Sequence, residues 1–205
     1  MARRGIIPRL RKDKKGITVV EFALISPVLM LLVCGTMEIC YDLYQRSVVQ
    51  GVIQRAARKA AVGGLTSGGV DNYIKDKVRP VLPDSSRDDP NAIIIVKKSY
   101  YNFSNVNKKE KLTQDLGTID VYNPATDCYE DANRNGNYDT GASAGSDGLG
   151  SADDIVYFEV TTTTPRLFPV VEMMGFSQNI SITTKTVIRN QPFGAQNAPV
   201  EVCPS

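Results

Sequence analysis

The sequence predicts an α+β protein in which one long N-terminal helix precedes a small mixed α+β head with an antiparallel sheet. Residues 17–37 are apolar except for Glu21, and residues 41–60 repeat apolar side chains at helical spacing. Runs of β-branched residues with the length of strands follow from residue 92 onward. The predicted division is a basic cytoplasmic leader at 1–16, a transmembrane helix at 17–40, an amphipathic stalk helix at 41–64 and an exported head at 65–205 with an acidic loop at 127–154.

The first sixteen residues hold seven Lys and Arg against one acid, so they carry +6 in a chain whose net charge is +2. Residues 17–205 are therefore mildly acidic, with a net charge of −4 (+2 minus +6). The positive charge of the whole chain would suggest nucleic-acid binding, but it is confined to the leader, so we expect no nucleic-acid partner. Basic residues on the N-terminal side of an apolar run indicate a cytoplasmic N-terminus and an exported head.

The apolar run extends from Ile17 to Met37 and contains one charge. At about 1.5 Å per residue it spans roughly 31 Å, which is the thickness of a membrane's hydrocarbon core. It therefore predicts a transmembrane helix, with a bend at Pro27. A secretory signal peptide is the alternative, but the run is long and no A-x-A-like cleavage site closes it.

Glu21 is the one charge in the apolar run. A carboxylate inside a membrane helix costs a few kcal/mol and indicates a function with a partner, unless the side chain snorkels to the interface. Cutting after Gly16 would free a positive amine on Ile17, one helical turn from Glu21. In a stack of similar helices, that amine could neutralise the Glu21 of a neighbour.

The helix is predicted to continue beyond the membrane to the glycines at 63–64. Its apolar stripe is expected to pack on the chain's own head rather than on a partner. The stripe comprises Tyr41, Tyr44, Val48, Val52, Ala56 and Ala60.

The head is predicted to contain short elements joined by loops. In chain order they are a helix at 70–82, a loop at 85–91, a buried strand at 92–96, a weaker strand at 119–122, a strand at 154–164, a loop with a helical turn at 165–176 and a strand at 180–189.

The acidic loop holds seven acids and one base, and its segment DANRNGNYD has short oxygen side chains at every second position. That order, with Gly136 at the sharp turn, is typical of a calcium loop, although Ala142 stands where a closing Glu is usual. Asp147, or the pair Asp153 and Asp154, would have to close the site. A solvated Asn/Asp/Gly turn fits the residue types equally well. The predicted ligands are Asp131, Asn133, Asn135, Asn137 through its carbonyl, Asp139 and Asp147.

Four cysteines divide between the helix and the head. Cys128 and Cys203 lie in the exported part, where oxidation is possible, and they are the expected disulfide pair. Cys34 and Cys40 are expected to be packing residues or a chance intermolecular contact. The spacing of the four does not match a structural zinc site.

An enzyme is not expected. The chain has no His, and it shows no Gly-rich phosphate loop, G-x-S-x-G elbow or CxxC motif. A hydrolase that uses Asp153 or Asp154 remains the one catalytic alternative.

A family resemblance follows from these motifs. The basic leader, Gly16 and then ITVVEFAL resemble the processing site of type IV pilin-like proteins, in particular TadE-like minor pilins of tight-adherence (Tad/Flp) systems. Two distal motifs, the segment from DANRNGNYD to GLGSADDIVYFEV and the ending TKTVIRNQPFG, are similar to the same family, whereas residues 65–125 are not. The resemblance implies cleavage after Gly16 by a prepilin peptidase and assembly through Ile17, Glu21 and Phe22. Phe22 stands where the shorter major pilins have Tyr, which indicates a minor component.

Three hypotheses result. The first is a minor pilin or pseudopilin that takes part in assembly of a Flp-type pilus, with the prepilin peptidase, other pilins and the Tad assembly apparatus as partners. The second is an uncleaved single-pass anchor that presents a calcium-binding extracytoplasmic head. The third is the hydrolase. In the first two the chain lies in the bacterial inner membrane, and in the first it would reach the pilus or cell surface after assembly.

Overall fold

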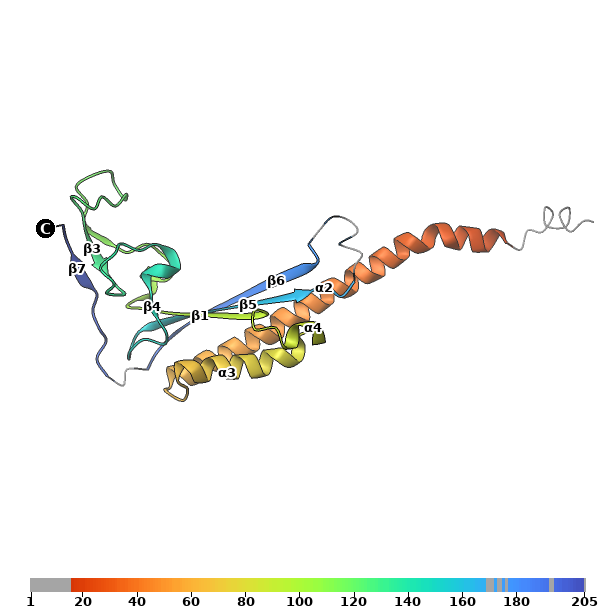
Figure 1. The fold of residues 1–205 in the computed structure, drawn as a ribbon, viewed down its shortest axis with the longest axis horizontal. Coiled ribbons are helices and arrows are strands. Elements are labelled where there is room, and N and C mark those ends of the chain that lie inside the picture. The colour runs from red at the N-terminus through yellow and green to blue at the C-terminus, as the bar shows by residue number, and fades with distance from the viewer. Residues whose placement is uncertain (1–15, 169–171, 173–174, 176, 192–193, 205) are drawn as a thin grey trace, which may run out of the picture. The chain divides into compact units, whose positions relative to one another are not determined.

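The computed structural model describes residues 16–204, except 169–171, 173–174, 176 and 192–193. The predicted α+β class is confirmed: a long helix precedes two antiparallel sheets with short helices between the strands (Figure 1). Two compact units divide the chain. The first comprises the residues up to Asp42 together with Arg166–Gln178, and the second comprises Leu43–Pro165 with Asn179–Ser205.

Helix α2 (Ile17–Ala61) has 45 residues and continues through Pro27. It ends three residues before the predicted end, where Gly63 adopts a φ of 75° and its N–H bonds to the carbonyl of Ala60. Glycine adopts this left-handed conformation more readily than other residues because it has no side chain, and a glycine in this conformation commonly ends a helix.

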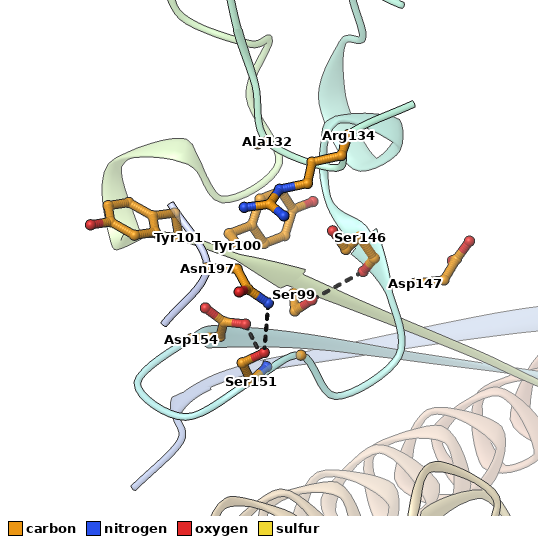
Figure 2. Close-up of a pocket in the computed structure, with 11 residues that line it drawn as sticks. Ser99, Tyr100, Tyr101, Ala132, Arg134, Ser146, Asp147, Ser151, Asp154 and Asn197 are labelled. Carbon is orange, nitrogen blue, oxygen red and sulfur yellow. Dashed lines mark hydrogen bonds between the residues drawn. The ribbon is translucent and has the colours of Figure 1, made fainter. Parts of the chain in front are cut away.

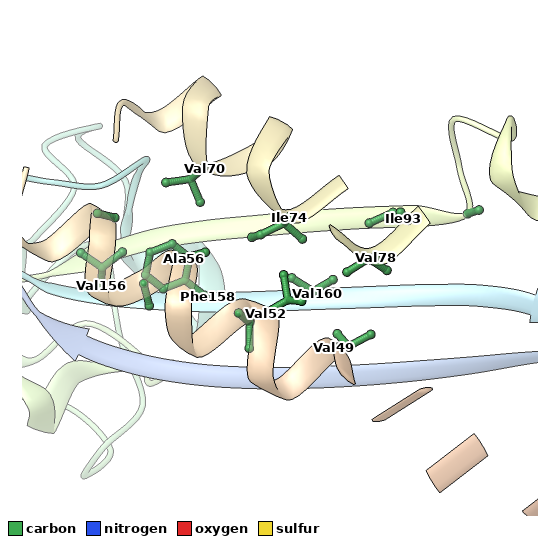
Figure 3. Packing of buried hydrophobic residues seen from close by; sticks show 14 of the residues in the cluster. Val49, Val52, Ala56, Val70, Ile74, Val78, Ile93, Val156, Phe158 and Val160 are labelled. Atoms are coloured by element: carbon green, nitrogen blue, oxygen red, sulfur yellow. The ribbon is translucent and has the colours of Figure 1, made fainter. Parts of the chain in front are cut away.

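The main core lies between the C-terminal part of α2, helix α3 (Ser67–Val78) and one face of the larger sheet (Figure 3). Val52, Ala56 and Ala60 of the predicted stripe are buried in it, so packing on the chain's own head is confirmed for them. Tyr44 is exposed, contrary to the prediction, and Gln45 beside it is buried. Near residue 45 the buried face of the helix is therefore shifted by one residue from the predicted stripe.

The larger sheet has the strand order β4-β1-β5-β6 and is antiparallel throughout. Strand β5 (Ile155–Pro165) is one of its two central strands and β6 (Asn179–Arg189) is an edge strand, and both match predicted strands within one residue. Alternate β5 residues, including Val156, Phe158 and Val160, enter the core. A smaller cluster of Tyr100, Ile155 and Tyr157 also forms, with Val106 packed against it.

Strand β1 (Ile93–Tyr100) extends four residues beyond the predicted strand. Its polar second half stays paired with β5, and Lys97 in that half pairs with Asp71 at 2.6 Å and donates to the carbonyl of Ser67 at 2.7 Å. These contacts join the strand to α3, and β4 (Ser146–Asp147) pairs with the same half of β1.

The smaller sheet contains three short strands that were not predicted: β2 (Leu112–Gln114), β3 (Cys128–Asp131) and β7 (Val200–Val202). The weak strand predicted at 119–122 is wrong. Asp120 has a φ of 66°, and Ile119 and Val121 are exposed on a turn.

The remaining elements are single turns. A 3₁₀ helix (Arg79–Val81) follows α3, and α4 (Asp84–Arg87) occupies the start of the segment predicted as loop at 85–91. Two more 3₁₀ turns span Phe103–Asn105 and Gly141–Ala144. The helical turn predicted within 165–176 falls mostly outside the described residues.

Candidate functional site

The N-terminal candidate site begins where α2 begins. Ile17 is its first residue, and the carbonyl of Gly16 accepts the N–H of Val20 at 3.2 Å. Glu21 and Phe22 are both exposed. Within the part of the chain that the structure describes, no hydrogen bond or ion pair joins Glu21 to another side chain. The leader, residues 1–15, lies outside the described residues.

The apolar run keeps its side chains on the surface. An 18-residue window of α2 has a mean hydropathy of 2.4, which is enough to cross a membrane, and none of that window is buried within the chain. Phe22, Leu24, Met30 and Leu32 are all more than 60 % exposed. A continuous apolar surface of this kind indicates contact with lipid or with other helices rather than with water.

The acidic loop is organised around Asp131, the last residue of β3. Its carboxylate accepts the backbone N–H groups of Asn135 at 3.2 Å and Gly136 at 2.7 Å. Gly136 has a φ of 76°, so the chain makes the sharp turn that the motif predicts at that position. Five predicted ligands, from Asp131 to Asp139, therefore lie on one tight loop.

The side chains of the loop converge on Asp139. The amide groups of Asn133 and Asn135 both donate to Oδ2 of Asp139, at 2.7 and 2.5 Å. Each amide carries its carbonyl oxygen on the same carbon as the donating nitrogen. Rotation of either side-chain amide by 180° would exchange its nitrogen and oxygen. The oxygen would then lie beside Asp139, where it could bind a cation.

Glu110 is the functional candidate that the sequence did not reveal. It is 3 % exposed, and its two carboxylate oxygens accept the N–H groups of Ala132 and Asp139, each at 2.9 Å. Burial raises its pKa, and the neighbouring charges of Asp131 and Asp139 raise it further. Glu110 lies 21 residues before Asp131, the first residue of the calcium motif, so no local spacing could have connected it with that motif.

The acids proposed to close the loop have other partners. Asp147 lies on β4 and pairs with Lys98 at 2.9 Å, and Asp153 pairs with Arg189 at 2.9 Å. Asp154 accepts the N–H of Ser151 at 2.5 Å. Glu110, rather than these three, is bonded to the loop, through the backbone N–H groups of Ala132 and Asp139.

A polar cavity of about 170 Å³ lies beside Asp154 (Figure 2). Arg134 borders it on one side, and Ser151 with Asn197 borders it on the other. Arg134 donates to the carbonyl of Ala198 at 2.8 Å. The cavity therefore lies where several loops of the head meet. The expectation that the chain is not an enzyme stays a prediction.

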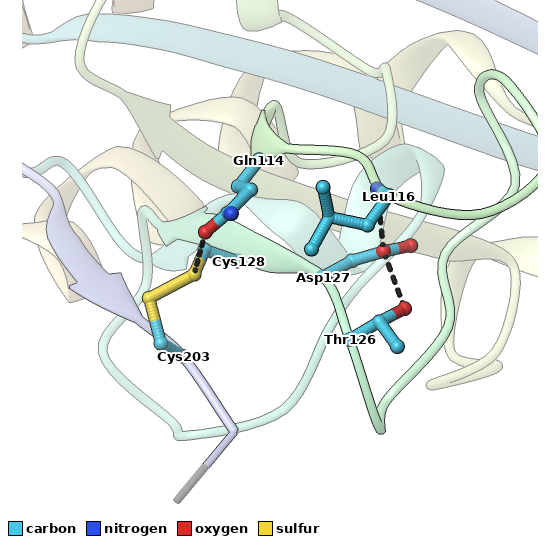
Figure 4. The surroundings of a disulfide bond; sticks show 6 residues. All are labelled: Gln114, Leu116, Thr126, Asp127, Cys128 and Cys203. Carbon is cyan, nitrogen blue, oxygen red and sulfur yellow. Dashed lines mark hydrogen bonds between the residues drawn. A yellow bond between two sulfur atoms is a disulfide. The ribbon is translucent and has the colours of Figure 1, made fainter.

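A disulfide joins Cys128 on β3 to Cys203 just after β7, across 75 residues of sequence (Figure 4). It anchors the C-terminal strand to the base of the acidic loop. Next to it, the buried carboxylate of Asp127 accepts the N–H groups of Leu116 and Asn123 and the hydroxyl of Thr126, at 2.8–3.0 Å. Cys34 and Cys40 are free thiols.

These features define a class of protein. A helix long and apolar enough to cross a membrane, whose C-terminal part belongs to the core of a small α+β head, is the architecture expected of a membrane-anchored, pilin-like subunit.

Comparison with known proteins agrees with this class. Residues 16–58 match the family described as TadE-like protein, so the resemblance of the N-terminal region is confirmed over those residues. The match indicates a pilin-like protein associated with the Tad pilus machinery. It covers about a fifth of the chain, and the two distal motifs lie outside it. No curated protein and no solved structure matches the chain.

Proposed function

We propose that the chain is a minor pilin or pseudopilin, cleaved after Gly16 by a prepilin peptidase and assembled with other pilins by the Tad apparatus. The observation that carries this proposal is the exposed apolar half of α2 with Glu21 near its start, inside the segment that matches the TadE-like family. The chain would reside in the bacterial inner membrane, with its N-terminus cytoplasmic and its head exported, until assembly moves it to the pilus or cell surface.

The proposed mechanism uses the geometry at the start of α2. Cleavage removes the seven basic side chains of the leader and creates a single amine on Ile17. Glu21 lies one turn further along the same helix and is exposed. Insertion of an unpaired carboxylate into the membrane costs about 3 kcal/mol. An amine from a neighbouring subunit at the same depth would remove much of that cost and would fix the stagger between the two helices.

The mass of the protein extracted from membranes tests the processing step. We expect the wild-type chain to begin at Ile17, because Gly16 presents no side chain to the peptidase. Gly16→Leu should leave the leader attached, whereas Gly35→Leu should be cleaved normally, since a side chain at position 35 meets no atom within 4 Å. A wild-type chain that retains its leader would instead support the uncleaved membrane anchor.

We also propose that the acidic loop binds calcium, which is compatible with either form of the anchor. The supporting observations are the calcium-type turn at Gly136 and the two hydrogen bonds that the buried Glu110 accepts from the backbone of the loop, from the N–H groups of Ala132 and Asp139. Glu110 replaces Asp147 as the candidate for the closing carboxylate, because Asp147 pairs with Lys98. Burial, more than the charges of Asp131 and Asp139, raises the pKa of Glu110, and a divalent cation bound beside it would favour its charged form.

Thermal unfolding with and without calcium tests this site. At a concentration 100 times the dissociation constant, a bound ion stabilises the head by about 2.7 kcal/mol, so the melting temperature should rise by several degrees. Asp131→Ala and Asp139→Ala should abolish the rise. Asp88→Ala, which removes an exposed acid elsewhere in the head, should keep it. An unchanged wild-type melting temperature in calcium and in chelator would contradict the proposal.

A further inference from the structure

An ion pair joins α2 to the connection between β5 and β6, which comprises Arg166–Gln178. Nη1 of Arg166 lies 2.7 Å from Oε1 of Glu38, and both residues belong to the first compact unit. Arg166 also joins the two ends of the connection by hydrogen bonds. Its backbone N–H donates to the carbonyl of Gln178 and its Nε–H to the carbonyl of Ser177, both at 2.9 Å.

The position of Glu38 fixes the depth of this contact. Glu38 directly follows Met37, the last residue of the apolar run, and it is 4 % exposed. A charged pair at that point is favourable only if it lies where the hydrocarbon ends and polar groups begin. Because the pair includes Arg166, the base of the β5–β6 connection lies at the same level as the end of the membrane-spanning segment.

The composition of the connection changes abruptly at Arg166. The two strands that it joins are rich in Thr and Ser, but residues 167–176 read LFPVVEMMGF and contain one charge, Glu172. Leu167, the first of them, is 44 % exposed, and Phe168 is partly exposed. Connections between strands in water are normally polar, so an apolar connection beside a membrane helix indicates a different surrounding medium.

We propose that Leu167 and Phe168 lie in the lipid of the membrane interface beyond Met37, and that the pair of Glu38 and Arg166 holds them at that depth. The argument for lipid as the occupant is continuity. The apolar run of α2 ends beside the base of this connection, so the two surfaces meet the same bilayer. Long side chains such as Arg166 keep their charge at the polar boundary while apolar neighbours enter the interface. The inference depends on the membrane-spanning part of the proposed function and not on cleavage or assembly.

The absence of Trp from the sequence makes a direct test possible, because one introduced Trp is then the only such fluorophore. Leu167→Trp, made in the full chain, would be reconstituted in phosphatidylcholine vesicles with and without bromine on the upper acyl chain. We expect at least twofold quenching by the brominated lipid and a blue-shifted emission. Leu116→Trp, at a residue that is 66 % exposed in the second unit, should show neither.

Two further variants separate this inference from its premise. Val28→Trp, in the middle of the apolar run, should be quenched by bromine placed deep in the acyl chain, which checks the span itself. Arg166→Gln in the Leu167→Trp background should reduce the quenching by at least half, whereas Arg189→Gln, which breaks the pair with Asp153, should not.

Quenching at position 28 without quenching at position 167 would overturn the inference and leave the membrane span intact. A blue shift at position 167 without quenching by brominated lipid, lost on dilution of the protein in the vesicles, would also overturn it, because the cover would then be a second copy of the chain. Loss of quenching at position 28 would remove the anchor on which the proposed function and this inference both depend.

Discussion

The apolar side chains of α2 are mostly exposed in its first half and mostly buried in its second half. Ile25, in the first half, is 64 % exposed, whereas Ile53, in the second, is fully buried against α3 and β5. Burial of one such side chain is worth about 1.5–3 kcal/mol, so a whole exposed run is untenable in water. The second half is stabilised by the chain's own head, and the first half is stable only in lipid or among other helices.

Two carboxylates repeat this contrast. Asp127, in the head, is buried and accepts three hydrogen bonds from its own loop. Glu21, on the exposed half of α2, has no bonded partner among the described residues. A charge that must leave water needs such partners. Asp127 has them within the chain, whereas under the proposed assembly the partner of Glu21 would come from a neighbouring subunit.

The largest expected effect sharpens the comparison between the two isoleucines. Ile53→Ala should lower the free energy of unfolding of the head by about 2–5 kcal/mol, because it leaves a cavity in the packed core. Ile25→Ala removes the same atoms from the exposed half and should change that free energy by less than about 0.5 kcal/mol. Denaturant unfolding of the full chain in detergent micelles measures both.

Equal losses for the two variants would break the comparison, since they would mean that the first half of α2 also packs on the head. Val19→Ala, at another exposed position of the run, is the matched control and should behave like Ile25→Ala.

A smaller effect is expected from pH. The N–H of Leu116, the hydroxyl of Thr126 and the N–H of Asn123 lower the pKa of Asp127. A carboxyl whose pKa is lower in the folded than in the unfolded state stabilises the fold above its unfolded pKa, near 3.9. That contribution disappears as the pH falls through the folded pKa.

Asp127→Asn should therefore be less stable than the wild type at pH 6, with the difference shrinking steadily below about pH 4. Burial raises the pKa of Glu110, which contributes in the opposite sense, but Glu110 is present in both proteins and cancels in the difference. Thermal unfolding from pH 3 to pH 6 measures the difference in stability between Asp127→Asn and the wild type. Glu21→Gln is the control, for which we expect no such pH-dependent difference. A difference independent of pH would show that the charge of Asp127 does not matter.

The sequence was most informative where a periodic pattern and burial coincide. Strands β5 and β6 alternate along their length and the second half of α2 repeats at helical spacing, so all three were predicted closely. The three strands of the smaller sheet have three or four residues each, too short for a period to be visible. The strand predicted at 119–122 failed because Asp120 turns the chain, and its apolar neighbours face outward.

The candidate sites show the same limit. Gly16, Glu21 and the turn at Gly136 are encoded locally, and residues close in sequence reveal them. Glu110 and the partner of Glu38 depend on pairing between distant segments, since Arg166 lies 128 residues beyond Glu38. Only the sheet and its connections bring those residues together, so no motif could have indicated them.

The most direct test of the central claim is the assembly of Glu21→Gln. After confirmation that its N-terminus is still Ile17, the amount of the chain recovered with sheared pili and with pilin complexes from the membrane would be compared with wild type. We predict a loss of at least tenfold, because the amine of a neighbouring subunit no longer finds a charged partner, and no loss for Glu201→Gln in the exposed head. Undiminished recovery of Glu21→Gln would contradict the account.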